Sequence, residues 1–560
     1  MILVLEDGTP ITDSVRYGFY ELADLTGLDF RSPQQDYEES DIRSLVLYYG
    51  KNPRAKGFEN SGIIQIVPRA MGQLGPMDDC SSNPTKAHAE AWQIVARLSK
   101  ARLFGDFTGD ERMGWINGRI LKVPFDFPML IYRLLNLEHE SNGEIDNLGR
   151  PIGKTTWAFR EGLYLLPLLE AVSEVFWTIC CIAGQRTGIP VVRKNRWPGQ
   201  FSSCLAVSHD IDVVRMWTLR HTVKEFLPAL IKPGLKPTSG MVKAAGASWC
   251  DGRKDPYWNF GKIAALEKKH GVRSTYFFLC RSRTQRISGQ RIVGSYGSRE
   301  YDVHRAIREL RSDGFEIGLH GGIDSSGDPE VLKKQKRGLE RLAGADCEGI
   351  RQHFLLYEKR RTPLAQSEAG FTYDSTFGFR DLCGYRALTG LPFTWPELYQ
   401  GTSSPFLEIP LIIMDSALMI HGGADKDKCC EIIDAILDDA AKFNSLTTVL
   451  WHNTSFGDTG HPWPEETFDH ILSKTRRAGG WTTTLGEVAS WWNARRQVRM
   501  KLKRCDFRFH VEMDGKFKGA SLTAEIFVPG RGILPISHPG NSTHAIEIPE
   551  APSITGSQNL

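Results

Sequence analysis

The chain has little of what would place it in a membrane or outside the cell. No apolar stretch approaches the roughly 18 residues that a membrane-spanning helix needs. The run MILVLED at residues 1–7 is too short and too acidic for a signal peptide. We therefore expect a cytoplasmic protein without a transmembrane segment.

An excess of one charge and a pattern of paired cysteines are also missing. Lys and Arg number 69 and Asp and Glu 66, which leaves a net charge of +3. Such a balance gives no electrostatic case for binding nucleic acid. The 11 cysteines contain no C-x-x-C zinc pattern, and the adjacent pairs Cys180 with Cys181 and Cys429 with Cys430 fit reduced core thiols better than a disulfide framework.

What the sequence does have is a regular alternation of apolar runs and amphipathic segments. The predicted strands are residues 203–212, 271–279, 315–322, 349–355, 370–376, 407–415, 447–453 and 481–485. The predicted helices are residues 259–270, 301–313, 330–342, 426–443, 465–477 and 485–496. Alternating strands and helices favour a parallel sheet. We expect an α/β fold whose centre, residues 199–497, is a distorted (β/α)7-type barrel.

The first predicted strand ends in the run His-Asp-Ile-Asp, with Asp210 and Asp212 at its tip. In an extended chain these two carboxylates point to the same side, and their repulsion is costly unless a cation or a shared proton offsets it. A metal site or an acid and base pair follows. The alternative is structural, with Asp210 capping a turn and Asp212 in solvent.

Three histidines stand at the ends of later predicted strands: His320, His353 and His452. The carboxyl ends of parallel strands form one rim, where α/β enzymes keep their catalytic groups. A single histidine at a strand end is usually structural, but three on one rim, together with the aspartates, indicate a metal site with groups for proton transfer.

The order HDID, VRSTYFFL, FEIGLHG, RQHFL, AGFTYDST, LWHN resembles the polysaccharide deacetylases, the NodB-homology domain of carbohydrate esterase family 4, over about residues 203–495. The resemblance implies a carbohydrate substrate, with Asp210 as catalytic base, Asp212 and His320 as metal ligands and His452 as general acid. Ile211 separates two aspartates that are adjacent in that family. The variant pattern is similar to a subfamily from bacterial capsule and exopolysaccharide gene clusters.

The third metal ligand differs from the family pattern, because Asp324 stands where a second histidine of the LHG motif is expected. We expect His353 to replace it, since neutral imidazole suits zinc and three protein ligands plus water form the usual catalytic zinc site. Asp324 is the competing candidate. The cofactor is then a divalent metal, with zinc favoured, although cobalt, nickel, manganese and iron accept similar ligands.

Further residues are expected to orient the catalytic groups or to bind substrate: Arg351, Arg386, Tyr373, Asp374 and Trp451. Arg351 would orient Asp210 through a bidentate pair, and Arg386 would reach a substrate hydroxyl or anionic group; for both, a surface ion pair is the alternative. Tyr373, Trp451 and Trp395 would stack on a sugar ring, or else belong to the core. His209 would orient a neighbour.

Two units flank the predicted barrel. Residues 1–198 read as an α/β or α+β domain of unknown role, with helices at 85–102 and 159–183 and a strand at 62–67. Its runs DFPMLIYRLLNLE and DNLGR resemble the N-terminal region that accompanies the deacetylase subfamily. We expect residues 194–199 to be a linker. Residues 498–560 read as a small β module, with strands at 498–503, 506–511 and 521–528 and a partly disordered tail from about residue 537.

Together these patterns predict a metal-dependent hydrolase of carbon–nitrogen bonds other than peptide bonds. The expected reaction is N-deacetylation of an amino sugar in a polysaccharide or its lipid-linked precursor, and a cytoplasmic location favours the precursor. In the expected mechanism a metal-activated water loses its proton to Asp210, and His452 protonates the leaving amine. One alternative is hydrolysis of another small amide. The other is a catalytically silent glycan-binding or scaffold protein of polysaccharide biosynthesis.

Overall fold

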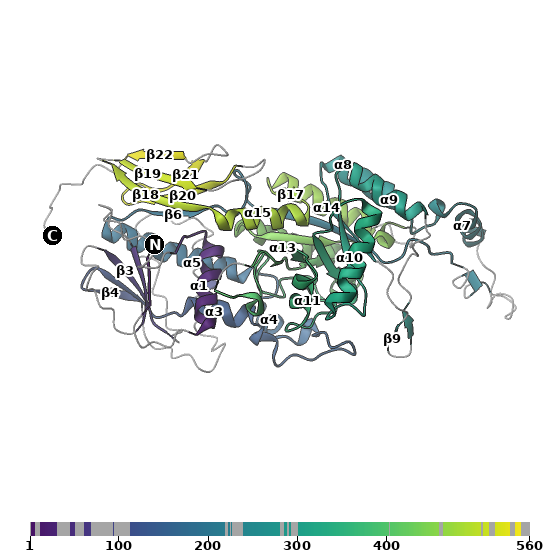
Figure 1. The fold of residues 1–560 in the computed structure, drawn as a ribbon, viewed down its shortest axis with the longest axis horizontal. Helices are drawn as coiled ribbons and strands as arrows, with labels where there is room; N and C mark the ends of the chain where they lie inside the picture. The colour runs from purple at the N-terminus through teal and green to yellow at the C-terminus, as the bar shows by residue number, and fades with distance from the viewer. Residues whose placement is uncertain are drawn as a thin grey trace.

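The computed structural model of the protein describes most of the chain (Figure 1). The described residues are 2–5, 12–30, 45–50, 61–68, 93–94, 113–218, 222–223, 226, 239–279, 285–287, 290–292, 301–401, 404–457, 463–505, 508–514, 521–537 and 544–549. In Figure 1, β3 and β4 lie at one end of the molecule together with β18 to β22, and helices α8, α9, α10 and α14 lie toward the other end.

The centre is a parallel sheet of nine short strands. They are β7 (Cys204–Ile211), β8 (Thr275–Leu279), β11 (Glu316–Gly321), β12 (Gly349–Gln352), β13 (Tyr373–Asp374), β14 (Leu407–Glu408), β15 (Ile413–Met414), β16 (Leu446–Leu450) and β17 (Trp481–Thr483). The order is β14-β13-β12-β11-β8-β7-β16-β15, and β17 pairs with the first half of β7. Strands and helices alternate along this part of the chain, as the sequence predicts.

One run of chain supplies both edges of this sheet. The predicted single strand at 407–415 is wrong in detail: its first half is β14, which pairs with β13, and its second half is β15, which pairs with β16. Pro410 stands between the halves and has no N–H for a ladder bond, and the Ile412 N–H donates to the Thr448 hydroxyl at 2.9 Å. Because the two edge strands are consecutive in the chain, the sheet must curl, which fits the expected distorted barrel.

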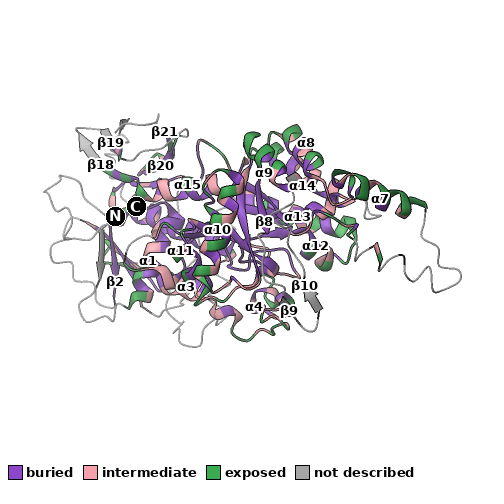
Figure 2. Cartoon of the chain, turned by 45° about the vertical axis from the view of Figure 1, so that its right-hand side comes forward, coloured by how far each residue is buried: buried purple, intermediate pink, exposed green. Residues whose placement is uncertain are grey.

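Amphipathic helices cover the outer face of the sheet, and Figure 2 shows a buried β8 with exposed residues on the outer sides of α8, α9 and α10. The helices of this region are α7 (Ser239–Cys250), α8 (Phe260–His270), α9 (Tyr301–Ser312), α10 (Pro329–Ala343), α11 (Thr362–Glu368), α12 (Asp415–His421), α13 (Lys426–Lys442), α14 (Trp463–Arg477) and α15 (Leu485–Gln497). The six predicted helices are confirmed, with ends within about two residues of the expected ones.

The alternation of side chains along β7 decides which residues reach the site. Leu205 and Val207 join the core under helices α8, α9 and α14, whereas Cys204 and Ala206 join the core of the opposite face. Successive side chains of a strand point to opposite faces. Asp210 and Asp212 therefore lie on the same face as Ala206, away from the covering helices.

Residues 1–194 contain a second, mixed α/β arrangement. Strands β1 (Ile2–Leu5), β2 (Leu45–Tyr49), β3 (Gly62–Ile66) and β5 (Ile120–Val123) are parallel, and β4 (Gly114–Ile116) runs antiparallel to β5. Its helices are α1 (Asp13–Thr26), α3 (Phe127–Leu135), α4 (Trp157–Arg160) and α5 (Leu168–Thr187). The helix predicted at 159–183 is wrong as one element, because residues 161–167 separate α4 from α5. The helix predicted at 85–102 lies almost wholly outside the described residues.

Helix α5 corrects the expectation that no apolar stretch of the chain approaches the length of a membrane-spanning helix. It has 20 residues, and its most apolar 18-residue window has a mean hydropathy of 1.3, so it is long and apolar enough to cross a membrane by length and composition. The protein buries 89% of its most apolar window, which is the burial of a core helix.

The C-terminal strands form two small antiparallel sheets. One contains β18 (Arg499–Cys505), β19 (Arg508–Asp514) and β22 (His544–Pro549), and the other contains β6 (Val191–Lys194), β20 (Thr523–Val528) and β21 (Gly532–Ser537). Strand β6 thus ties the segment before the barrel to the segment after it. Within the tail that is predicted to be partly disordered, residues 544–549 form β22 and pair with β19; residues 550–560 lie outside the described residues.

Candidate active site

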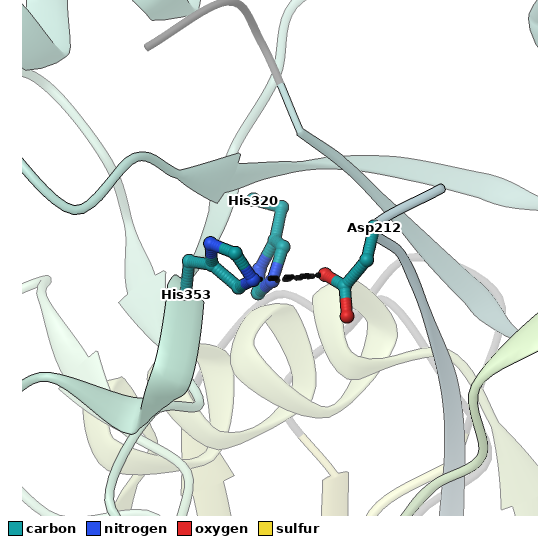
Figure 3. A group of neighbouring side chains, drawn as sticks. All are labelled: Asp212, His320 and His353. Carbon is teal, nitrogen blue, oxygen red and sulfur yellow. Dashed lines mark ion pairs between the residues drawn. The ribbon is translucent and has the colours of Figure 1, made fainter. Parts of the chain in front are cut away.

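Three predicted metal ligands converge at one rim of the curled sheet. One ligand atom from each of Asp212, His320 and His353 lies within 4.8 Å of the other two. Asp212 Oδ1 is 3.0 Å from His320 Nε2 and 3.5 Å from His353 Nε2. Figure 3 shows both imidazoles directed at the Asp212 carboxylate. The group that the structure brings together contains His353 and not Asp324.

The hydrogen bonds around this cluster suit a bound cation. His320 Nδ1 lies 2.9 Å from the Arg351 carbonyl oxygen, which can only accept, so Nδ1 carries a proton and Nε2 is directed at the site. Asp212 Oδ1 is buried, and among the described residues no hydrogen bond of acceptable geometry reaches it. Two imidazole nitrogens and one carboxylate oxygen are a donor set that zinc accepts.

The pKa values of the cluster show how strongly its groups interact. Burial would raise the pKa of Asp212, but the contact with His320 and the nearby charges of His353 and His452 hold it well below its usual range. Burial lowers the pKa of His353 to about 4, although Asp212 opposes the shift. Burial also disfavours charge on His320, but Asp210 and Asp212 outweigh it and raise that pKa. A bound cation would replace the His320 proton.

The prediction that His353 continues strand β12 is wrong. His353 instead begins the turn that follows the strand. The next two residues, Phe354 (φ 61°) and Leu355 (φ 53°), adopt the left-handed conformation, which costs a bulky residue roughly 1–3 kcal/mol. The Phe354 ring stacks on the His353 imidazole with centroids 4.1 Å apart. This turn ends the strand and directs the imidazole toward Asp212.

Asp210 is buried and held by an arginine. Arg351 Nη1 donates to Asp210 Oδ1 at 3.0 Å and to the Ser208 hydroxyl at 2.7 Å, and its other nitrogens donate to Ser375. The expected bidentate pair with Asp210 is therefore wrong, because one nitrogen alone contacts that carboxylate. The other oxygen, Asp210 Oδ2, lies 3.8 Å from His320 Nε2 and thus faces the candidate metal site.

His452 lies on the other side of Asp212. It is paired with Asp415, which could not be recognised as a site residue from the sequence. His452 Nδ1 donates to Asp415 Oδ1 at 2.6 Å, and the His452 N–H and the Ser455 hydroxyl donate to Asp415 Oδ2 at 2.8 and 2.5 Å. His452 Nε2 lies 3.7 Å from Asp212 Oδ2. Burial disfavours the charged imidazole, but Asp415 outweighs it and raises the pKa of His452 to about 10.

His209 points away from these groups, as strand alternation requires. Its Nδ1 donates to the Trp451 carbonyl at 2.7 Å, and its Nε2 lies 3.0 Å from Glu267 Oε1 on α8. The buried ring therefore links β7 to the residue before His452 and to a covering helix.

The aromatic residues proposed to stack on sugar are core residues instead. Tyr373, Trp395 and Trp451 are at most 1% exposed. The Tyr373 hydroxyl donates to Glu316 Oε1 at 2.7 Å, and Trp395 Nε1 donates to Glu408 Oε2 at 3.0 Å. None of the three presents a ring face to solvent, so the stacking predictions are wrong.

Arg386 is likewise used within the protein. Its Nε and Nη2 donate to the two carboxylate oxygens of Glu140 at 2.7 and 2.9 Å, and its Nη1 donates to the Gly378 carbonyl at 3.2 Å. The expected substrate contact is corrected to a buried bidentate ion pair with a residue 246 positions earlier in the chain.

Asp374 lies in the core and forms a pair with the residue opposite it on β14, Glu408. Burial raises the pKa of Asp374 to about 7 and raises the pKa of Glu408 well above its usual range. Two adjacent buried carboxyls can share one proton. With no exposed surface, Asp374 has no direct access to a substrate, which corrects its predicted role.

Comparison with known proteins assigns no family to this chain: no family model matches it, and no curated protein matches its sequence. Its fold is similar to that of a Mycobacterium smegmatis protein named as a polysaccharide deacetylase (17% identity, 55% of this chain and 96% of that chain, TM-score 0.36). It is also similar to Puue allantoinase (20%, 53% and 93%, 0.35) and to the Bc1960 peptidoglycan N-acetylglucosamine deacetylase (14%, 53% and 90%, 0.27). TM-scores this low carry no argument about the function of this chain.

Proposed function

We propose that this protein is a metal-dependent hydrolase of carbon–nitrogen bonds other than peptide bonds, and that it removes an N-acetyl group from an amino sugar of a glycan or glycan precursor. The observation that carries the proposal is the arrangement of Asp210 and His452 around the cluster Asp212, His320 and His353. The Asp210 carboxylate and the charged His452 imidazole flank this cluster. Its candidate ligand atoms are two imidazole nitrogens and one carboxylate oxygen.

Amide hydrolysis needs the groups found here. When bound, a divalent metal lowers the pKa of water and polarises an acyl carbonyl. Asp210, with Oδ1 fixed by Arg351 and Oδ2 facing the cluster, is placed to accept the proton of the attacking water. His452, kept charged by Asp415, is placed to donate a proton to the leaving nitrogen.

The proposal also specifies that the acyl group removed is an acetyl group and that the substrate is an amino sugar. Both points are supported by the order of motifs from HDID to LWHN, which resembles the polysaccharide deacetylases.

The experiment compares an amide with an activated ester. Full-length protein loaded with zinc should release acetate from an oligomer of N-acetylglucosamine and should also hydrolyse 4-nitrophenyl acetate. His452→Ala should lose about 100-fold or more on the amide and much less on the ester, whose leaving group needs no proton.

The matched control is His470→Ala, since His470 also pairs with an aspartate, Asp434, at 2.8 Å, but on the outer helix α14. This variant should hydrolyse both substrates as the wild type does. Equal losses on amide and ester in His452→Ala would remove His452 from the mechanism. Hydrolysis of a small amide such as allantoin with no acetate release would contradict the sugar substrate, and no hydrolysis of any probe would favour a silent protein.

A further inference from the structure

We propose that Arg150, in the N-terminal part of the chain, is a positioning residue for the metal site, because it holds the turn that presents His353. The proposal rests on the proposed function in that it takes His353 as a metal ligand. It gives a role to the run DNLGR, residues 146–150, which the hydrolytic mechanism does not use.

The turn after His353 needs support from outside itself. Phe354 and Leu355 both have positive φ values, and neither is a residue that adopts this conformation readily. Such a backbone persists only where surrounding contacts over-determine it. Arg150 Nη1 supplies one such contact, since it donates to the Phe354 carbonyl oxygen at 2.6 Å.

Arg150 is itself rigidly placed. Its Nε and Nη2 donate to Asp146 Oδ2 at 2.9 and 2.7 Å, which leaves Nη1 for the Phe354 carbonyl. Asp146 Oδ1 accepts the backbone N–H groups of Leu148 and Arg150, and the Asp146 N–H donates to the Arg150 carbonyl. Burial opposes the charge of Asp146, yet the hydrogen bonds from Arg150 lower its pKa to about 2. The contacts within residues 146–150 therefore fix the guanidinium independently of its contact with the turn.

A second contact joins the same two segments. Lys359, a few residues after His353, donates to the Asn136 carbonyl at 2.8 Å. Residues 136–150 thus hold the chain that follows β12 at two points, and Arg150 holds the point next to the ligand. Lysine could not replace Arg150 fully, because one ammonium cannot reproduce the planar fork that binds Asp146 and the carbonyl together.

The test is zinc affinity of the full-length protein, measured by competition with a chromogenic chelator. Arg150→Met should weaken zinc binding about 10- to 100-fold, which is typical of losing a group that orients a metal ligand. Arg150→Lys should weaken it less. The matched control is Arg380→Met: Arg380 also contacts Asp146 Oδ2, at 3.3 Å, but is 41% exposed and lies outside the turn. It should change the affinity less than about twofold.

A double-mutant cycle tests the cause. Glycine adopts positive φ without strain, so Phe354→Gly should make the turn less dependent on Arg150. The loss caused by Arg150→Met should then fall below about threefold in the Phe354→Gly background. An equal loss in both backgrounds would overturn the proposed cause.

The remaining outcomes separate this proposal from the function it rests on. Wild-type zinc affinity in Arg150→Met, or an equal loss in Arg380→Met, would overturn the positioning role and leave the proposed function standing. A wild-type protein that binds no zinc, cobalt or manganese would overturn the metal-dependent function itself. If Arg150→Met does not fold, Arg150→Lys takes its place, both alone and in the Phe354→Gly background.

Discussion

His452 donates from Nδ1 to Asp415 Oδ1 across 2.6 Å, and Asp415 also accepts the backbone N–H of the same histidine. The carboxylate thereby fixes the imidazole with Nδ1 protonated and stabilises its charged form. Nε2 is the atom left to face Asp212 Oδ2, at 3.7 Å. A histidine held in this way is suited to donate a proton at a fixed place.

Asp415→Asn should therefore move the pH dependence of the reaction. In the proposed mechanism His452 donates its proton only while the imidazole is charged, and Asp415 is the main cause of its pKa of about 10. Without that charge, burial lowers the pKa, so the alkaline limb of the kcat profile should shift to lower pH and turnover at pH 8 should fall about 100-fold. Turnover measured from pH 5 to 10 checks this, and an unchanged alkaline limb would contradict the pairing.

Asp210 and Asp212, at the end of β7, should have different functions. Asp210→Asn should keep metal binding close to that of the wild type and lower turnover by about 100-fold or more, because an amide cannot accept the proton. Asp212→Asn should weaken the metal itself. Metal content and turnover of both variants check this; an equal loss of metal in both would show that base and ligand are wrongly assigned.

His353 and Asp324 compete for the third ligand, and the cluster in the structure favours His353. His353→Gln should reduce zinc affinity by about 100-fold or more, whereas Asp324→Asn should leave it nearly unchanged. Affinity measured for both variants decides the matter, and the reverse ranking would move the third ligand to Asp324.

The buried pair of Arg386 and Glu140 predicts an effect on stability alone. Glu140→Gln leaves a buried guanidinium without its charged partner, which costs about 3 kcal/mol or more. The melting temperature should fall clearly, and Glu140→Gln combined with Arg386→Met should recover part of the loss. Zinc affinity should stay at the wild-type value; a large loss of zinc with an unchanged melting temperature would show that the pair serves the site and not the fold.

The strand ends and their polar residues could be predicted from sequence because apolar runs, turn signals and charged tips are local patterns. These patterns predict that Asp210, Asp212, His320 and His353 lie at one rim. Asp415 was missed even though it ends the predicted strand at 407–415, since a lone aspartate carries no motif. Pro410 was the signal that this strand is divided.

Two properties of the fold explain why some roles could not be predicted from the sequence. Strands of a parallel sheet are apolar on both faces, so the sequence does not show that Tyr373 and Trp451 point into the core. Arg386 contacts Glu140, and Arg150 contacts the Phe354 carbonyl. In both pairs the two residues are more than 200 positions apart in the chain. Such contacts leave no periodic pattern.

The proposed function depends most directly on the position of the metal. A crystal of the zinc-loaded protein, with anomalous diffraction recorded above and below the zinc absorption edge, should place one ion about 2.0–2.2 Å from Asp212, His320 Nε2 and His353 Nε2. Asp210 and His452 should flank that ion without binding it. An ion at other residues, or no ion at saturating zinc, would contradict the account.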